Sequence, residues 1–185
     1  MKKSIIILLV FAATYSYGQQ PTRLGPGMNI DSFMKAKQTQ AIDKPFPLFS
    51  SYFDGKVFNN ENLKGKTVFI NFWFAACAPC IAEMDALNDL YARLKSNKNF
   101  EFISFTFETP EKTEQLIQQY KIQYKVFSLE EADCRRLNLN AGFPTSIILD
   151  SGGMVKYFKN GGTTDKAEAK RFVFAEFYPK IVSLL

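Results

Sequence analysis

The chain has 185 residues, of which 46% are hydrophobic and 22% charged, and its 23 Lys and Arg residues outnumber its 18 Asp and Glu residues. This length is enough for one domain with a sizeable core. The absence of histidine and the count of three cysteines exclude Ser-His-Asp and Cys-His catalysis, imidazole-ligated metals and haem, and a four-thiolate zinc site within one chain. The basic residues form no stripe interleaved with aromatic residues, so nucleic-acid binding is not supported.

The N-terminus has the pattern of a secretory signal peptide. A basic start over residues 1–3 precedes an apolar run over residues 5–13, and Ser16 and Gly18 place small residues where a signal peptidase reads them. We expect cleavage after Gly18, which removes residues 1–18. The alternative is an uncleaved membrane anchor with the same flanks. Either way the protein is predicted to be exported, to the periplasm, where cysteines can serve as redox groups.

Residues 19–44 are expected to form a tether or a loosely packed arm. They contain Pro21, Gly25, Pro26 and Gly27 and show little hydrophobic periodicity, which is typical of a linker. The domain itself is predicted to cover residues 45–185.

Strand and helix signals alternate along this domain. Runs of β-branched and aromatic residues predict strands, and apolar residues at three- and four-residue spacing predict helices. In chain order we expect an extended segment over 45–49, a turn at Asp54-Gly55 leading into 56–58, a buried strand over 67–72, a helix from 79 to about 96, a strand over 100–107, a helix from 110 to near 120, a short strand around 126–127, a short helix over 130–137, a strand over 145–149 with a hairpin partner over 154–158, and a last helix from about 164 that Pro179 interrupts. This order predicts an α/β fold whose central sheet is mixed and has helices on both faces.

Cys77 and Cys80 form a C-x-x-C pair between the buried strand and the helix that follows it. Cys77 falls at the helix N-terminus, where free N–H groups and the helix dipole lower a thiol pKa. Cys80 lies one turn further on, is better buried and can close a disulfide with Cys77. A static disulfide across so short a loop would stabilise the fold little. The spacing therefore predicts a redox-active pair in preference to a static bridge or two core thiols.

The segment that contains this pair resembles a segment of a known protein family. The sequence NFWFAACAPCIAEM over residues 71–84 closely resembles the active-site segment of exported thioredoxin-like proteins of the TlpA/ResA type. The Pro-Phe-Pro opening, the Asp-Gly turn, the Leu-Lys-Gly-Lys lead-in and the Gly-Phe-Pro-Thr segment over 142–145 extend the likeness from about Asp43 to the C-terminus. The resemblance implies a thioredoxin-like fold and a thiol–disulfide oxidoreductase that needs no cofactor and no metal.

The resemblance also implies roles for single residues. Cys77 would be the nucleophile and Cys80 the resolving thiol. Pro144 matches a cis-proline that lies against the disulfide, and with Phe143 it would form part of the substrate groove. Glu83 would exchange a proton with the buried thiol. The alternative for Glu83 is a carboxylate that only favours the first helical turn through the helix dipole.

Other positions leave more than one interpretation open. Trp73 is expected either to pack near the site, against substrate, or to fill the core. Asn71 stands where ordinary thioredoxins carry a buried acid, and Ala76 stands where the relatives usually have Trp. Cys134 is expected to be a buried small residue, with a third redox thiol or an intermolecular bridge as the alternative.

The resemblance implies a reductant of exported proteins such as apocytochrome c, with an upstream membrane thiol donor. Its partners would be protein disulfides, and a membrane only if the N-terminal segment stays uncleaved. One alternative is a thiol peroxidase, although such a site has Thr three residues before its cysteine and this chain has Phe74. Another is a non-enzymatic module that binds peptides or Cu(I), although the copper-handling relatives have a longer cysteine spacing and a His.

Overall fold

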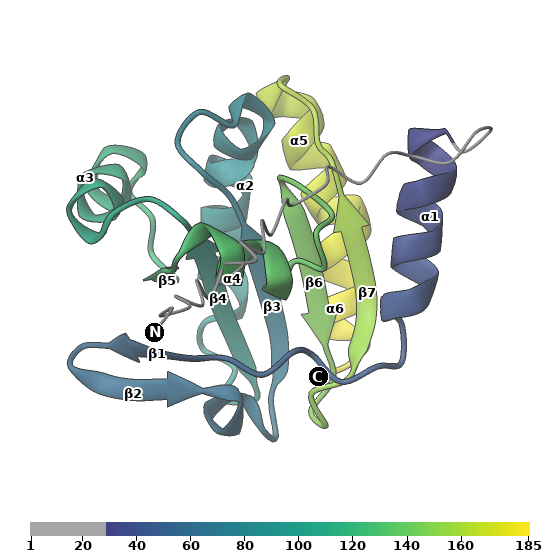
Figure 1. Cartoon of the computed structure of the whole chain (residues 1–185), viewed down its shortest axis with the longest axis horizontal. Helices are drawn as coiled ribbons and strands as arrows, with labels where there is room; N and C mark the ends of the chain where they lie inside the picture. The colour runs from purple at the N-terminus through teal and green to yellow at the C-terminus, as the bar shows by residue number, and fades with distance from the viewer. Residues whose placement is uncertain (1–28) are drawn as a thin grey trace, which may run out of the picture.

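The computed structural model describes residues 29–185, so the predicted signal peptide lies outside the described residues. The elements are, in chain order, α1 (Ile30–Ala41), β1 (Ser50–Phe53), β2 (Lys56–Asn59), a 3₁₀ turn (Asn60–Leu63), β3 (Thr67–Phe72), α2 (Ala78–Leu94), β4 (Phe100–Thr106), α3 (Pro110–Tyr120), β5 (Lys125–Ser128), α4 (Glu131–Leu137), β6 (Thr145–Leu149), β7 (Val155–Asn160), α5 (Lys166–Phe172), a π-helical turn (Val173–Phe177) and α6 (Tyr178–Val182). From residue 45 onward they follow the predicted order (Figure 1), except that the extended segment predicted over 45–49 has only an isolated bridge at Pro45 and the first strand, β1, begins at Ser50.

The centre of the molecule is a five-stranded mixed sheet in the order β5-β4-β3-β6-β7. β3 pairs in parallel with β4, and β4 with β5, whereas β6 runs antiparallel to both β3 and β7. The β1–β2 hairpin forms a separate small sheet. The predicted mixed sheet is thus confirmed, and β3, which carries the cysteine loop at its end, is its middle strand.

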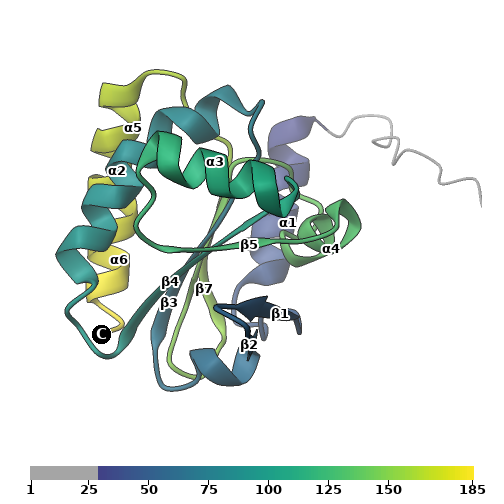
Figure 2. The same ribbon diagram turned by 90° about the vertical axis from the view of Figure 1, so that its left-hand side faces the viewer.

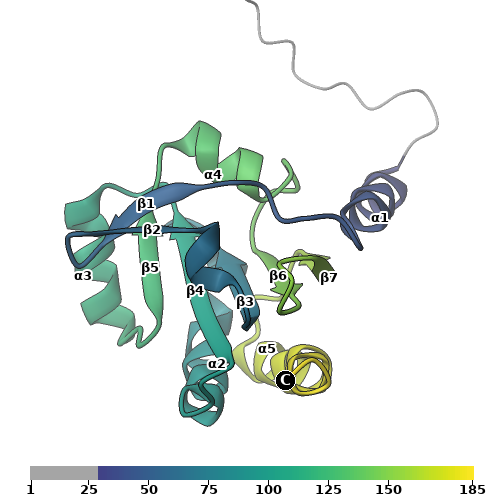
Figure 3. The same ribbon diagram turned by 90° about the horizontal axis from the view of Figure 1, so that it is seen from below.

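Both faces of the sheet are covered. One face packs against α2, α3 and the C-terminal helices, and the other against α4 and the β1–β2 hairpin (Figures 2 and 3). All six residues of β3 are buried, as expected for a central strand of a sheet with two covered faces. Alternate side chains of β3 enter opposite cores: Val68 and Ile70 pack on the hairpin side, and Phe69 packs on the α2 side.

Residues 30–41 differ from the expected loosely packed arm. They form α1, whose N-terminus is capped by the Asn29 side chain, which accepts a hydrogen bond from the Ser32 backbone N–H at 2.7 Å. The helix lies beside β7 (Figure 3), and the Lys37 ammonium donates to the Leu139 carbonyl at 2.9 Å. A polar helix of this kind has a weak hydrophobic pattern, so contact with the sheet edge and a good cap decide its formation.

The C-terminal helix was predicted to be kinked or interrupted at Pro179, but its geometry changes before that residue. The helix changes to a π-helical turn at Val173–Phe177 before α6 begins at Tyr178, and Pro179 lies in the first turn of α6. Proline is tolerated there because the N–H it lacks has no partner in a first turn. Among the described residues, no helix has the length and apolar character needed to cross a membrane.

Candidate active site

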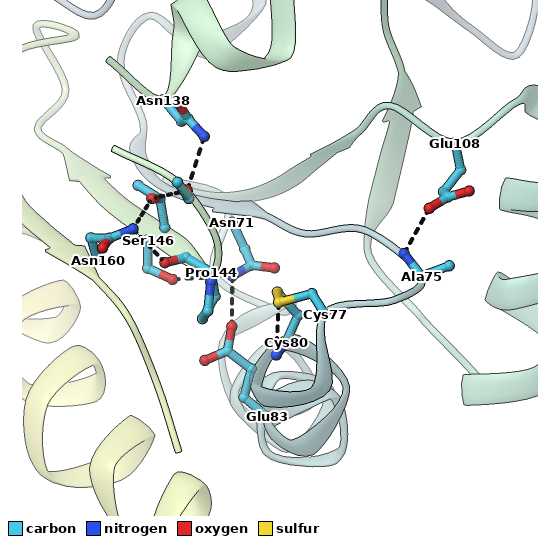
Figure 4. Close-up of a disulfide and its surroundings, with 12 residues drawn as sticks. Asn71, Ala75, Cys77, Cys80, Glu83, Glu108, Asn138, Pro144, Ser146 and Asn160 are labelled. Atoms are coloured by element: carbon cyan, nitrogen blue, oxygen red, sulfur yellow. Dashed lines mark hydrogen bonds between the residues drawn. A yellow bond between two sulfur atoms is a disulfide. The ribbon is translucent and has the colours of Figure 1, made fainter. Parts of the chain in front are cut away.

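Cys77 and Cys80 form a disulfide at the start of α2 (Figure 4). Cys77 is the N-cap residue, and its sulfur accepts a hydrogen bond from the Cys80 backbone N–H at 3.3 Å. Only 5% of Cys77 and 1% of Cys80 is exposed. Both cysteines are thus buried, with Cys77 at the positive end of the helix dipole and Cys80 within the first turn.

The loop between β3 and α2 is held from two sides. The Ala75 backbone N–H donates to the Glu108 carboxylate at 2.7 Å, and the Cys77 N–H donates to the Phe74 carbonyl at 3.1 Å. Glu108 lies just beyond the end of β4, so the neighbouring parallel strand positions the cysteine loop. Sequence reasoning missed Glu108, because nothing in its local pattern indicates a contact with residue 75.

Glu83 is a buried carboxyl one turn beyond Cys80. Only 6% of it is exposed, and its Oε1 accepts a hydrogen bond from Asn71 Nδ2 at 3.0 Å. The same amide donates to Ser146 Oγ at 3.1 Å. Burial raises the pKa of Glu83 to about 8, and the bond from Asn71 opposes that rise. The carboxyl therefore carries a proton at neutral pH while the disulfide is closed.

The peptide bond between Phe143 and Pro144 is cis, as the resemblance implied. Pro144 faces the disulfide across the site (Figure 4). Its carbonyl accepts hydrogen bonds from the Asn160 side chain at 3.1 Å and from the Gly161 backbone N–H at 2.9 Å. The Thr145 hydroxyl donates to the Gly142 carbonyl at 2.7 Å. This proline loop is thus positioned by side chains from β6 and β7.

Comparison with known proteins identifies the family. A family model described as Redoxin matches residues 41–172. The thiol-disulfide oxidoreductase ResA of Bacillus cereus is 32% identical over 126 residues, which cover 66% of this chain and 72% of that protein. The chain belongs to the redoxin family.

Further relatives of this redoxin have related names. The thiol:disulfide interchange protein DsbE of Haemophilus influenzae is 27% identical over 172 residues, which cover 90% of this chain and 91% of that protein. A crystal structure of a thiol:disulfide interchange protein of the thioredoxin family from Chlorobium tepidum has a TM-score of 0.57 and 28% identity, and covers 73% of this chain and 97% of that one. The expected thioredoxin-like fold is confirmed.

Trp73 lies in the core of this redoxin. Its side chain is fully buried, and its indole N–H donates to the Ser104 hydroxyl at 2.6 Å. This placement fits core packing, the second interpretation left open by the sequence, and offers no ring surface to a substrate. The burial follows from the strand alternation, since residue 73 continues the α2-facing side of β3 beyond Phe69 and Asn71.

Cys134 is buried within α4 and makes no disulfide. Burial raises the pKa of its thiol to about 12, so it is held as an unreactive thiol in this conformation. The placement fits the expected small core residue. Within residues 29–185, the structure brings together no group of three or more Cys, Asp or Glu side chains able to hold a metal ion.

Gly162 is a second site residue that sequence reasoning missed. A Cβ atom there would lie 3.2 Å from Pro144 Cγ, 3.5 Å from Pro79 Cβ and 3.8 Å from Glu83 Oε2. The position therefore lies against both prolines of the site and beside the buried carboxyl. A pocket of about 600 Å³, lined in part by Glu83, Gly162 and Arg171, opens here. The Gly161-Gly162 doublet after the last strand was the available signal, since paired glycines often mark close approach.

Proposed function

We propose that this thiol–disulfide oxidoreductase reduces disulfides of exported proteins through a mixed disulfide at Cys77. One observation carries the proposal: the Cys77–Cys80 disulfide lies at a helix N-terminus with the buried, protonated carboxyl of Glu83 one turn away. A static bridge needs neither a thiolate-stabilising helix end nor a titratable group behind it.

The reaction consists of two exchanges. The thiolate of reduced Cys77 attacks one sulfur of the substrate disulfide, which forms a mixed disulfide and releases the first substrate thiolate. The thiolate of Cys80 then attacks the Cys77 sulfur, which closes the Cys77–Cys80 disulfide and releases the second substrate thiolate. Two electrons pass to the substrate, and the two released thiolates take up two protons.

Glu83 supplies the proton relay for the inner sulfur. When a donor thiolate attacks Cys77 and reopens the disulfide, Cys80 leaves as a thiolate in a buried setting, where its charge is costly. The protonated carboxyl of Glu83 can neutralise it by transferring a proton. In the substrate-reducing half of the cycle the Glu83 carboxylate takes that proton back, which frees the Cys80 thiolate to attack.

The proline loop provides the binding edge. Phe143 and Pro144 border the disulfide, and backbone groups of Phe143 can pair with an extended substrate segment as in strand addition. Trp73 contributes only through packing beneath the site. The hydrogen bond from Asn160 to the Pro144 carbonyl and the closeness of Gly162 to Pro144 support this assignment.

The proposals on export and on the direction of electron flow rest on the leader pattern and on the relatives. The segment over residues 1–18 supports a periplasmic location. The relatives, which are named as a thiol-disulfide oxidoreductase and a thiol:disulfide interchange protein, support protein disulfides as the substrate class. Apocytochrome c is the example that the TlpA/ResA resemblance implies. A membrane thiol donor would then restore the dithiol. A thiol peroxidase is disfavoured, because its site has a Thr hydroxyl three residues before the cysteine and this chain has Phe74 there.

Trapping tests the mechanism. Cys80→Ser, reduced and mixed with a disulfide-containing peptide, should accumulate a mixed disulfide that survives non-reducing electrophoresis and is dissolved by dithiothreitol. Cys77→Ser is the matched control, because it keeps Cys80 and Cys134 and should trap nothing. Equal trapping by the two variants, or none by Cys80→Ser, would contradict the assignment of Cys77 as nucleophile.

A further inference from the structure

Three half-buried aromatic rings meet beside the disulfide. Phe74 comes from the loop after β3, Phe107 follows the end of β4, and Phe143 precedes the cis-proline. Their ring centroids are 5.2 Å (Phe74–Phe107), 5.3 Å (Phe74–Phe143) and 5.5 Å (Phe107–Phe143) apart. We call these three residues the aromatic cluster. Each ring is in contact range of the other two, and each keeps part of its surface in solvent.

The aromatic cluster borders the loop that carries the reacting sulfur, since Phe74 and Phe143 pack against the same core as Cys77 and Cys80. The Cys77 N–H donates to the Phe74 carbonyl at 3.1 Å, and Phe143 is bonded to Pro144, which faces the disulfide (Figure 4). The surface immediately around Cys77 consists of small groups, because Ala76 and Ala78 are exposed and present only methyl groups. The aromatic cluster is therefore a large apolar surface available to a polypeptide joined to Cys77.

The mixed disulfide limits what can occupy this surface. An extended chain advances about 3.3–3.6 Å per residue, so only side chains within a few positions of the attacked cysteine can reach rings that lie beside Cys77. The occupant is consequently part of the substrate itself and not a separate partner.

The charged groups around the aromatic cluster indicate which class of substrate side chain it can bind. The Arg135 guanidinium lies 5.7 Å from the centroid of Phe143 and is paired with Glu131 at 2.6 Å. A substrate Lys or Arg at this place would compete with a cation already over the ring, whereas an apolar side chain would bury ring surface without that conflict.

We propose that the aromatic cluster binds a large apolar side chain of the substrate, aromatic or branched aliphatic, within a few residues of the cysteine that joins Cys77. Phe74 is the specificity-determining residue, because its loop also carries the nucleophile. This inference rests on the proposed function and names its substrate class.

The test uses matched peptides and the whole protein. Each peptide contains one disulfide and differs from its partner only by Phe or Ser at a single position, from three residues before to three after the attacked cysteine. The second-order rate of reduction by the dithiol protein is measured for each pair. At one or more positions the Phe peptide should react about tenfold faster, equivalent to about 1.4 kcal/mol.

Variants locate the preference. Phe74→Ala should bring the Phe-to-Ser ratio close to one, and Phe74→Leu, which keeps an apolar side chain, should preserve most of it. Tyr52→Ala is the matched control, because it removes an aromatic ring that is 73% exposed on β1 and should leave the ratio as in the unmodified protein. Circular dichroism confirms folding, and Phe107→Ala serves if Phe74→Ala does not fold.

The two proposals fail in different ways. Equal rates for both members of every pair, or a preference that survives both Phe74→Ala and Phe107→Ala, would overturn the cluster as the recognition surface while exchange itself continues. A faster reaction of peptides with Lys in place of Phe would likewise overturn an apolar occupant. Absence of exchange with every peptide would overturn the proposed function, and this inference with it.

Discussion

The side-chain amide of Asn71 donates a hydrogen bond to the Glu83 carboxyl at 3.0 Å, in the interior of the protein behind the disulfide. The second N–H of the Asn71 amide donates to Ser146 Oγ, so both amide protons are used. A neutral donor favours the ionised carboxyl, whereas burial favours the protonated one. Burial dominates and leaves Glu83 with a pKa of about 8, high enough to hold a proton at neutral pH and low enough to release it.

Removing this titration should change how the disulfide responds to pH. In the disulfide form Glu83 is protonated below about pH 8, so proton donation to Cys80 fades as the pH rises through that value. Glu83→Gln should slow reduction of the disulfide by a thiol donor about 10²-fold below pH 8, the lower range for general acid catalysis. The rate of this variant should no longer fall as the pH rises above 8. The measurement is a stopped-flow pH profile, with rates divided by the donor thiolate concentration. An identical profile for Glu83→Gln would show that Glu83 transfers no proton in this step.

The same group should make stability depend on pH. The pKa of Glu83 is raised from 4.5 to about 8 on folding, so between these values the folded protein holds a proton that the unfolded chain releases. The protonated carboxyl makes its full contribution to the free energy of unfolding below about pH 4.5, and this contribution is lost as the pH rises through about 8. Relative to the unmodified protein, Glu83→Gln should gain on the order of a few kcal/mol in free energy of unfolding between pH 5 and pH 9. Urea titrations of the disulfide form measure this difference; a constant difference would argue against a buried neutral carboxyl.

Asn71→Asp should push the titration of Glu83 upward. The change removes a donor at 3.0 Å and adds a second carboxyl in its place, and like charges at such a distance resist joint ionisation. The midpoint of the reduction profile should rise by about one unit or more, as one macroscopic value of the pair. Ser146→Ala is the control, because it removes a neighbour of Asn71 without adding charge. A midpoint equal to that of the unmodified protein would contradict contact between the two side chains.

Gly162→Ala should impair exchange more than it impairs folding. Its added Cβ would lie 3.2 Å from Pro144 Cγ and 3.5 Å from Pro79 Cβ, which crowds the two prolines beside the disulfide. We expect about a fivefold or larger fall in the rate with peptide disulfides, with a loss of stability near 1 kcal/mol. Gly152→Ala is matched in crowding, at 3.3 Å from Asp150 Oδ1, but lies in the β6–β7 turn and should leave exchange unaffected. Equal effects of the two variants would point to crowding alone.

The reduction potential of the Cys77–Cys80 pair decides the direction of electron flow. Thioredoxin lies near about −270 mV and the oxidant DsbA near about −120 mV. A dedicated reductant should lie toward the first value, measured by equilibration of the protein in thiol buffers and counting of alkylated cysteines. A value close to that of DsbA would reverse the proposed direction and leave the thiol chemistry intact.

Much of the site was predictable because it is local. A C-x-x-C pair after a buried strand places one sulfur at a helix end and the other a turn inside, whatever the rest of the chain does. Glu83 follows at helical spacing, and the Gly-Phe-Pro-Thr segment indicates its proline loop by resemblance. The order of strands and helices was readable for the same reason, since each element has its own periodicity.

The helix α1 was not predictable in this way. Its sequence carries little hydrophobic periodicity, and what stabilises it lies elsewhere: a cap from Asn29 and contact of Lys37 with the Leu139 carbonyl, more than one hundred positions away. Trp73 was ambiguous because an indole beside a cysteine loop can face either solvent or core. Its hydrogen bond to Ser104 on the neighbouring strand settles the matter.

By itself, the sequence determined the disulfide pair, its place at a helix N-terminus and the mixed α/β sheet, because helix ends, strand periodicity and cysteine spacing act over a few residues. Only the tertiary structure decided the electrostatic state of Glu83, the contacts of Gly162 and the meeting of Phe74, Phe107 and Phe143. These depend on burial and on distances between segments far apart along the chain. A pKa near 8 for a carboxyl arises from the low-dielectric surroundings that packing creates, which no local pattern contains.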